Sequence, residues 1–173
     1  CVLFGDGAGA VVMGPEGGTA KVLDVVAGTD GSKAGILTLS TGGTRHPFNQ
    51  EAVTSGAYNH LTMNGREVFR EAVRRMSEAA REIIERVGAS LAAVALVVPH
   101  QANQRIIDAV GKELGVEPDR MYSNIASYGN IGSATVPFAL WEARRNGRIR
   151  PGDLVVAAAF GAGFHWAAAA VQF

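Results

Sequence analysis

Two polar side chains in this sequence have the types and the placement needed to stabilise an oxyanion. His100 lies in the run Pro99-His100-Gln101-Ala102-Asn103, directly after the apolar segment 94–98. Asn130 lies thirty residues further on, in Gly129-Asn130-Ile131-Gly132. An imidazole N–H and a carboxamide N–H are neutral donors that can stabilise negative charge on an oxygen without acting as a base. We expect this pair to form half of a site for thioester chemistry.

The nucleophile that such chemistry needs is not evident in the chain. A cysteine thiolate is the expected group, but the only cysteine is Cys1. It lies beside the apolar run 2–4 and is expected to be a small packing residue. The sequence opens without Met and inside this apolar run. We therefore expect the chain to be the C-terminal part of something longer.

Alternating strands and helices are predicted to position the pair. The helix over 64–87 has apolar residues at three- and four-residue steps, Asn64 and Glu67 as a capping box, and Gly88 at its end. Further helices are predicted over 103–114 and 133–146, and 28–58 is predicted to be a long loop containing one short strand, 36–39. Strands are predicted over 2–4, 10–13, 21–27, 94–98, 121–123, 154–160 and 166–173. This order predicts an α/β fold with a mixed sheet.

Simpler interpretations exist for several of these residues. A histidine after a strand is often structural, and Asn130 after Gly129 has an alternative as a turn residue in the left-handed conformation. The run Gly5-Asp6-Gly7-Ala8-Gly9 suggests a phosphate loop, but its spacing is neither G-x-G-x-x-G nor Walker A, and a strand is expected after it. The remaining histidines lack ligand spacing, so we infer no metal site: His46, His60 and His165.

Composition narrows the class of protein. The 16 basic and 16 acidic residues cancel, which argues against nucleic acid as the main partner. One cysteine excludes an internal disulfide framework and fits a reducing cytosol, so a cytoplasmic location is expected. No stretch approaches eighteen uninterrupted apolar residues, so no membrane span is predicted. A length of 173 residues fits one domain.

Five ordered segments resemble β-ketoacyl-acyl-carrier-protein synthase III, the initiating condensing enzyme of bacterial fatty-acid synthesis. They are Phe4-Gly5-Asp6-Gly7-Ala8-Gly9-Ala10, Met63-Asn64-Gly65-Arg66-Glu67-Val68-Phe69, Val98-Pro99-His100-Gln101-Ala102-Asn103, Tyr128-Gly129-Asn130-Ile131-Gly132-Ser133 and Phe160-Gly161-Ala162-Gly163-Phe164. The resemblance spans essentially the whole chain. It implies that residues 1–173 are the C-terminal half of a thiolase-like αβαβα fold, a mixed sheet with packed helices. The N-terminal half, with its catalytic cysteine, is then absent, and Cys1 does not match that cysteine.

The resemblance also implies roles for individual residues. His100 and Asn130 match the family's polarising pair, which stabilises an enolate oxygen, and Ala162 matches a backbone donor to a second oxyanion. Asn103 matches a residue of the active-site network, although it is an equally good helix N-cap. Gly65 and Phe69 match positions near the pantetheine tunnel, with a plain core role as the alternative for Phe69. Basic positions that dock the acidic carrier protein, or else form a solvated charged face, are matched by Arg70, Arg105 and Lys112.

The implied reaction is a decarboxylative Claisen condensation. A short acyl-coenzyme A such as acetyl-coenzyme A primes the cysteine, and malonyl-acyl-carrier protein extends it. No cofactor is implied beyond the coenzyme A thioester as substrate, a homodimer is expected for the full enzyme, and the chain alone is expected to be inactive. Alternatives are a polyketide-type or hydroxymethylglutaryl-type synthase and a non-catalytic carrier-protein-binding module. Ile131, His165 and the segment 42–58 depart from the family pattern and leave the acyl primer open.

Overall fold

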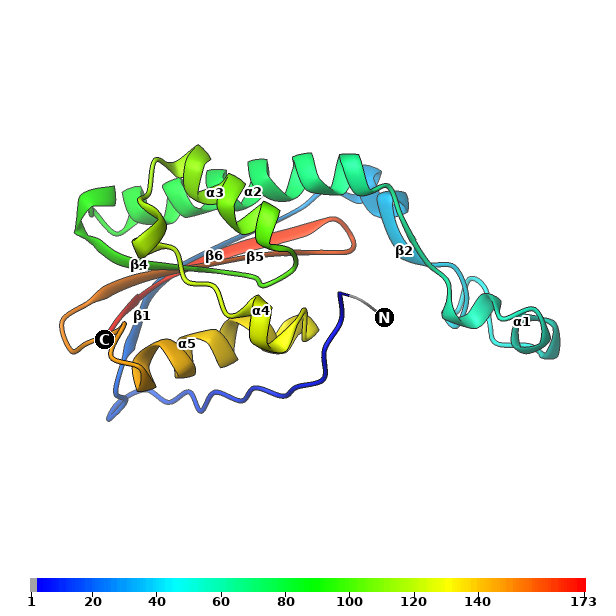
Figure 1. Ribbon diagram of the computed structural model, residues 1–173, viewed down its shortest axis with the longest axis horizontal. Helices are drawn as coiled ribbons and strands as arrows, with labels where there is room; N and C mark the ends of the chain where they lie inside the picture. Colours follow the sequence, from blue (N-terminus) through cyan, green and yellow to red (C-terminus); the bar gives the residue numbers. More distant parts are fainter. Residues whose placement is uncertain (1–2) are drawn as a thin grey trace.

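A mixed four-stranded sheet forms the centre of the molecule (Figure 1). The computed structural model describes residues 3–173, so Cys1 lies outside the described residues. The sheet order is β1 (Lys21–Thr29), β6 (His165–Gln172), β5 (Leu154–Gly161) and β4 (Val94–Pro99). β4 is parallel to β5, whereas β6 is antiparallel to both β5 and β1. The predicted α/β fold with a mixed sheet and packed helices is confirmed.

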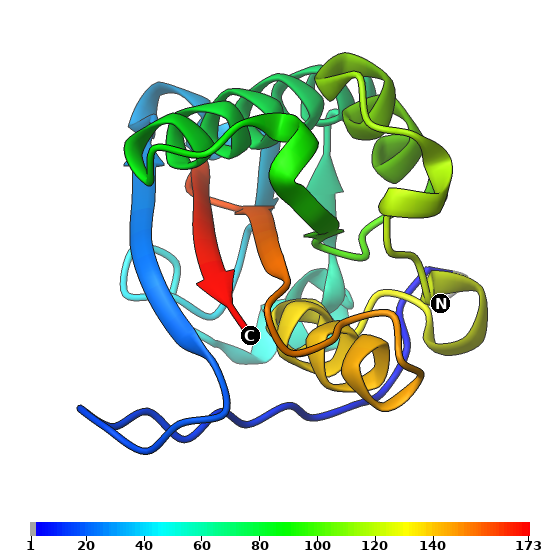
Figure 2. The same ribbon diagram turned by 90° about the vertical axis from the view of Figure 1, so that its left-hand side faces the viewer.

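One face of the sheet is covered by α2 (Gly65–Arg86) and α3 (Gln104–Leu114), as Figures 1 and 2 show. The centre of the apolar stripe of α2 is fully buried, with Ala72, Met76 and Ile83 all at 0% exposure. At its start the Asn64 side chain accepts a hydrogen bond from the Glu67 N–H, 3.3 Å away. The amphipathic period and the Asn64 cap predicted from the sequence are therefore realised. The capping box does not close, because the Asn64 N–H donates to the Ile36 carbonyl at 2.8 Å rather than to Glu67.

The opposite face is covered only in part. The helix α5 (Thr135–Arg145), preceded by the short α4 (Ile125–Tyr128), packs against β4 and β5. Burial between two helical layers explains why β4 is apolar on both faces. β1 lies beyond the reach of α5 on this side (Figure 2), and its Val25 is 50% exposed.

The long segment between β1 and α2 projects from the body of the molecule (Figure 1). Its β2 (Leu37–Leu39) pairs with β3 (Leu61–Met63), and α1 (Gln50–Thr54) lies between them. The predicted strand near 36–39 is present, whereas β3 and α1 were not predicted. Short 3-10 helices complete the chain: Gly31–Ile36, Ala57–Asn59, Leu91–Ala93, Pro118–Arg120 and Gly132–Ala134.

Three predicted strands do not form. In the described part of 2–4, Phe4 makes only an isolated bridge to Asn130. Residues 5–14 are irregular, and the segment Gly5–Thr19 runs along α4 and α5 (Figure 1). Residues 121–123 contribute only one bridge, between Met121 and Val97. A strand needs a hydrogen-bonded neighbour, and in the described part of the chain none lies beside 10–13, where Val12 is 99% exposed.

Candidate active site

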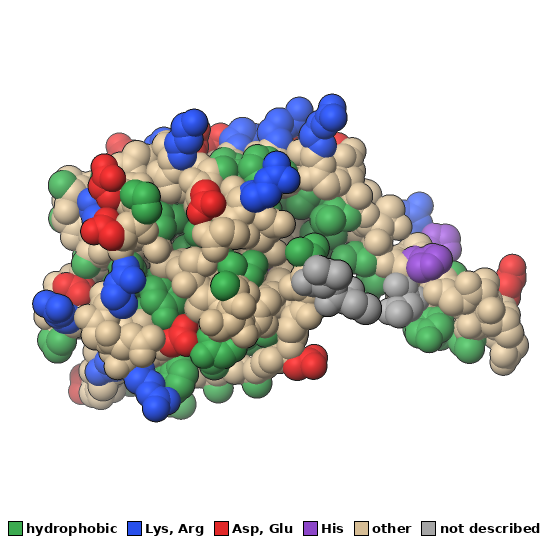
Figure 3. All heavy atoms as spheres, in the orientation of Figure 1, with side chains coloured by type: hydrophobic (Ala, Val, Ile, Leu, Met, Phe, Trp, Pro, Cys, Tyr) green, Lys and Arg blue, Asp and Glu red, His purple; other side chains and the backbone are tan. Residues whose placement is uncertain are grey.

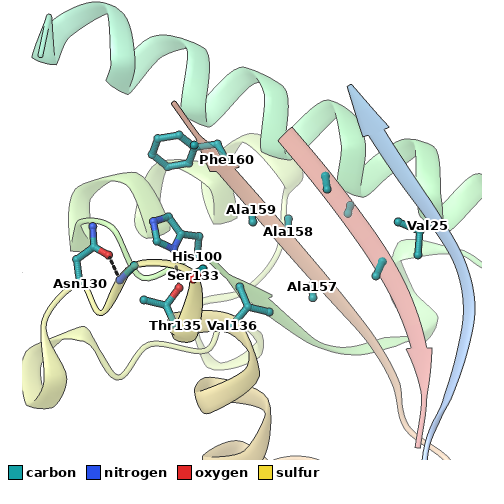
Figure 4. Close-up of a pocket in the computed structure, with 15 residues that line it drawn as sticks. Val25, His100, Asn130, Ser133, Thr135, Val136, Ala157, Ala158, Ala159 and Phe160 are labelled. Atoms are coloured by element: carbon teal, nitrogen blue, oxygen red, sulfur yellow. Dashed lines mark hydrogen bonds between the residues drawn. The ribbon is translucent and has the colours of Figure 1, made fainter. Parts of the chain in front are cut away.

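His100 directly follows Pro99, the last residue of β4. Its backbone N–H donates to the Ala158 carbonyl of the neighbouring β5, 2.7 Å away, so the sheet continues to hold the backbone of the histidine. The imidazole Nδ1 lies 2.5 Å from the hydroxyl oxygen of Thr135, the first residue of α5. The ring also meets Phe160 edge to face, with 5.5 Å between ring centroids. Figure 4 shows His100 between these two neighbours.

Burial sets the charge of His100. Desolvation lowers the pKa of the imidazole to about 4, because a charged ring would lose its hydration. The ring is therefore neutral near pH 7 and carries one N–H. Among residues 3–173, Thr135 is the single hydrogen-bond partner of the ring and it meets Nδ1. The other nitrogen, Nε2, is available to a ligand.

Asn130 is fixed through both its backbone and its side chain. Its N–H donates to the Leu3 carbonyl (2.8 Å), and its carbonyl accepts from the Gly5 N–H (3.1 Å). The side-chain oxygen accepts from the Gly132 N–H at 2.9 Å (Figure 4). This bond occupies the acceptor end of the carboxamide. Because the described chain offers no acceptor to Nδ2, the donor end is free for a ligand.

The alternative interpretation of Asn130 as a left-handed turn residue is wrong. Within residues 3–173, positive φ angles occur only at glycines. Gly129 (φ 67°) and Gly132 (φ 63°) adopt them on either side of Asn130. Glycine lacks the Cβ that penalises this region, so these two residues supply the turn and leave Asn130 in an ordinary conformation.

A fully buried amide connects the two loops. Gln101 is 0% exposed, and its Nε2 donates to the carbonyls of Pro99 (2.7 Å) and Tyr122 (3.2 Å). Its Oε1 accepts from the Asn124 N–H at 3.0 Å. The side chain thus joins the backbone beside His100 to the segment that leads to Asn130, and all its hydrogen bonds are made inside the protein.

Glu142 on α5 anchors the same segment. Its Oε2 accepts from the Tyr122 hydroxyl and the Asn124 amide, both at 2.8 Å, and its Oε1 accepts from the Tyr128 hydroxyl at 2.7 Å. Burial alone would raise the pKa of Glu142, but the hydrogen bonds from Tyr128, Asn124 and Tyr122 hold it below its ordinary value. The carboxylate therefore stays ionised and links the loop before Asn130 to the helix behind it.

Two pockets meet at His100 and Asn130. One, of about 490 Å³, lies against the partly covered sheet face and is floored by alanines of β5 and β6 (Figure 4). The other, of about 770 Å³, lies between the start of α2, α3 and the base of the projecting segment. Four residues line both pockets: His100, Asn130, Phe160 and Gly161. Both donors are therefore open to a ligand from either side.

The structure brings most, but not all, of the expected site residues together. Those lining the larger pocket with the donor pair are Gly65, Phe69, Asn103, Arg105 and Ala162. The Ala162 N–H makes no hydrogen bond within the described chain. Asn103 caps α3, since its Oδ1 accepts from the Arg105 N–H at 2.9 Å.

Two of the expected basic residues lie outside the pocket lining. Arg70 on α2 has 69% of its side chain exposed and lies 3.8 Å from Glu71. Lys112 is exposed in the last turn of α3. Basic side chains gather over the α2 and α3 layer in Figure 3, and these two helices carry Arg70, Arg105 and Lys112.

Three residues of the site were not identified from the sequence. Thr135 and Glu142 sit on α5, and their partners lie far away along the chain, so no local pattern marks them. Gln101 was visible within the His100 run, but its burial was not. Buried polar groups need specific partners, and such partners become visible only in three dimensions.

No cluster of three or more metal-binding side chains exists among the described residues. In the same part of the chain, every helix is too short or too polar to cross a membrane.

Comparisons with known proteins agree on one family. The family model described as 3-oxoacyl-[acyl-carrier-protein (ACP)] synthase III C terminal matches residues 84–173. The model described as 3-oxoacyl-[acyl-carrier-protein (ACP)] synthase III matches residues 1–31. A curated relative, the β-ketoacyl-[acyl-carrier-protein] synthase III of Nitratidesulfovibrio vulgaris strain Miyazaki F, is 46% identical over 173 residues, which is 100% of this chain and 52% of the relative.

Solved structures show the same likeness. The 3-oxoacyl-[acyl-carrier-protein] synthase III of Aquifex aeolicus matches with a TM-score of 0.85 and 37% identity, over 100% of this chain and 51% of that one. The β-ketoacyl synthase III of Thermus thermophilus matches with a TM-score of 0.79 and 40% identity, over 99% and 52%. The chain spans about half the length of the curated relatives it matches.

Proposed function

Because the chain belongs to the 3-oxoacyl-[acyl-carrier-protein] synthase III family, we propose that it supplies the oxyanion-stabilising half of that condensing site. In the whole enzyme a cysteine takes the acyl group from a short acyl-coenzyme A. Malonyl-acyl-carrier protein then loses carbon dioxide, and its thioester becomes an enolate. The enolate carbon attacks the carbonyl carbon of the acyl-cysteine. This attack forms the new carbon–carbon bond and releases the cysteine thiolate.

His100 and Asn130 stabilise the enolate oxygen in this proposal. The observation that carries it is the hydrogen bond from the Gly132 N–H to Asn130 Oδ1, which leaves the Asn130 amide N–H as a donor beside the neutral ring of His100. Neutral donors stabilise the oxyanion without taking a proton. Ala162, whose N–H is free within the described chain, supplies a backbone donor to the second oxyanion, which forms when the acyl-cysteine is attacked.

The larger pocket provides access for the thioester arm. Gly65 and Phe69 line it near the start of α2, Asn103 supports the donor pair, and Arg105 lies at its rim. We assign Arg105, Arg70 and Lys112 to docking of the acidic carrier protein, because a local basic surface is sufficient for such docking even at zero net charge. The coenzyme A thioester enters this proposed reaction as a substrate, and the proposal includes no cofactor. A cytoplasmic location accompanies this assignment, because a single cysteine fits a reducing compartment.

Residues 1–173 act as the C-terminal half-domain, and a preceding half carries the nucleophile. Exposed apolar side chains support this division. Val11, Val12 and Met13 are 67%, 99% and 76% exposed, and Val25 on the uncovered side of β1 is 50% exposed. Contiguous exposed apolar surface is uncommon on a self-sufficient domain. The complete enzyme is a homodimer in this proposal, and the isolated chain is inactive.

The experiment separates the two half-reactions in the complete enzyme, made by joining or co-expressing this chain with the N-terminal half of a relative. His100→Ala and Asn130→Ala are expected to slow malonyl decarboxylation by about a hundred- to a thousandfold and to leave cysteine acylation largely intact. His46→Ala is the matched control, because His46 is exposed on the projecting segment.

Two results would contradict the proposal. The first is an equal loss of acylation and decarboxylation in the His100 and Asn130 variants, because the donors are assigned to the second step alone. The second is condensation by the isolated chain that disappears on Cys1→Ala. Carrier-protein binding without any turnover in the complete enzyme would indicate a non-catalytic binding module instead.

A further inference from the structure

The contact between Thr135 and His100 determines which ring nitrogen faces a ligand. The hydroxyl oxygen of Thr135 lies 2.5 Å from Nδ1, and Thr135 is only 1% exposed. A threonine hydroxyl has one proton to donate and two lone pairs to accept with. A neutral imidazole likewise has one N–H and one bare nitrogen. The short distance therefore has two interpretations. Either the Thr135 hydroxyl donates to a bare Nδ1, or a protonated Nδ1 donates to the hydroxyl oxygen.

Burial of the hydroxyl distinguishes the two. Within residues 3–173, His100 Nδ1 is the single hydrogen-bond partner of the Thr135 hydroxyl. If Nδ1 carried the proton, the hydroxyl hydrogen would be buried without an acceptor, which costs about 1–3 kcal/mol. If the hydroxyl donates, its proton is satisfied and Nδ1 is bare. The proton of the neutral ring is then on Nε2.

We propose that Thr135 is a positioning residue that donates to Nδ1 and thereby holds His100 with a protonated Nε2 toward the pockets. This inference rests on the proposed function, because it explains why His100 serves as a donor to an oxyanion rather than as a base. With the opposite tautomer, Nε2 would present a lone pair and repel the developing negative charge. Thr135 acts through His100 and needs no contact with substrate.

Nitrogen-15 NMR of the histidine-labelled 173-residue chain tests the tautomer without any substrate. His100→Gln identifies the His100 signals. At neutral pH the wild-type ring is expected to show a protonated Nε2 and a bare, hydrogen-bonded Nδ1. In Thr135→Val the Nδ1 signal is expected to move downfield, to the position of a nitrogen that accepts no hydrogen bond. Thr135→Ser keeps a hydroxyl and is expected to retain the wild-type position.

The chain contains a matched control. Thr29 Oγ1 lies 2.8 Å from Nδ1 of His165 in an exposed pair, so Thr29→Val removes a threonine–histidine contact elsewhere. It is expected to leave the His100 signals unchanged. A wild-type His100 with its proton on Nδ1 would overturn the inference, as would identical Nδ1 signals in Thr135→Val and Thr135→Ser. The first of these is read from the wild-type spectrum, with His100→Gln used only to assign the signals, and so does not depend on how well the Thr135 variants fold.

The complete enzyme supplies the functional readout. Thr135→Val is expected to slow malonyl decarboxylation by at least about tenfold, short of the loss from removing a donor outright, with cysteine acylation unchanged. Thr135→Ser is expected to restore the rate. A wrong tautomer contradicts this inference alone, whereas normal decarboxylation by His100→Ala contradicts the proposed function whatever the tautomer.

Discussion

At the scale of single residues, desolvation accounts for the behaviour of His100. The pKa of the ring is lowered to about 4 in the folded chain, against an ordinary value of 6.5. As the pH falls from about 6.5 to about 4, the imidazole therefore becomes protonated in the unfolded chain but stays neutral in the folded chain. Stability must decrease over the same window, because protons bound by the unfolded state favour unfolding. Well above pH 6.5 both states are neutral and the effect vanishes.

We predict that His100 makes the chain acid-sensitive between pH 7 and pH 4. The free energy of unfolding of the wild type is expected to fall over this range by up to about 3 kcal/mol more than that of His100→Gln. Urea unfolding of both chains at a series of pH values measures the difference, in which the other titrating groups cancel. Parallel curves for the two chains would show that the ring is solvated.

Individual residues were predictable only where their local sequence is distinctive. The runs around His100 and Asn130 were sufficient to single out both donors. The left-handed alternative for Asn130 was wrong because Gly129 and Gly132 already supply the positive φ angles that the turn needs. Thr135 could not be found, because it meets His100 only when the start of α5 packs against the end of β4. The catalytic roles of the donors remain predictions.

At the scale of elements, the loop that carries Asn130 is held from two directions. Glu142 on α5 accepts three hydrogen bonds from the segment 122–128 on one side. On the other side, the backbone of Leu3 and Gly5 brackets Asn130 in a short parallel pairing. The loop has little regular structure of its own, so these contacts decide where the Asn130 amide lies.

Glu142→Ala is expected to lower the free energy of unfolding by about 2 kcal/mol, because it removes a charged acceptor from the buried Tyr122 hydroxyl and from Asn124. Glu142→Gln is the control and is expected to lose less than half as much, since its amide oxygen still accepts. Denaturant unfolding gives both values. If Glu142→Ala lowers the free energy of unfolding by less than about 0.5 kcal/mol, the effect is that of an ordinary surface substitution. Glu142 would then not anchor the loop.

Gly5 and Gly7 form a matched pair for the other side of the loop. A Cβ on Gly5 would overlap the backbone carbonyl of Tyr128, whereas a Cβ on Gly7 would meet the flexible end of the Ile131 side chain at 2.9 Å. Gly5→Ala is therefore expected to cost at least about 1 kcal/mol more stability than Gly7→Ala. It should also shift the side-chain amide signal of Asn130 in an NMR spectrum. Equal effects of the two substitutions would mean that the Leu3–Gly5 pairing does not hold the loop.

Regular elements with strong periodicity were predictable, and those that depend on a distant neighbour were not. The start of α2 was predicted from the Asn64 cap, and its core face from the spacing of its apolar residues. The segment 10–13 has the apolar character of a strand, but no strand of the described chain lies beside it. The β3 strand was missed because it has only three residues and is exposed, so it lacks the burial pattern that marks a strand.

At the scale of the whole molecule, the distribution of apolar surface is uneven. The sheet is covered by α2 and α3 on one face, but on the other face β1 leaves Leu23 and Val25 at 40% and 50% exposure. The extended segment before β1 adds Val11, Val12 and Met13 to the exposed set. Surface of this kind is typical of a protein interface, and we assign it to packing against the proposed N-terminal half.

Val12→Lys tests this interface. In the isolated chain the substitution is expected to change the free energy of unfolding by less than about 0.5 kcal/mol, because Val12 is 99% exposed. Its affinity for a complementing N-terminal half is expected to fall by at least about tenfold, the equivalent of one buried valine side chain. Ser90→Lys adds the same charge at an exposed position after α2 and is expected to bind normally. Equal affinities for the two variants would exclude Val12 from the interface.

The pairing of Phe4 with Asn130 has a consequence for recombination between relatives. A chimeric gene that changes parent at Lys21 would set the Leu3–Gly5 backbone of one parent against the Asn130 loop of the other. A crossover upstream of Leu3 would keep both partners of the pairing from one parent. A crossover site that keeps the donor pair intact therefore lies before Leu3, ahead of the first strand of this chain's own sheet. Chimeras joined at that site should preserve the geometry of the donor pair.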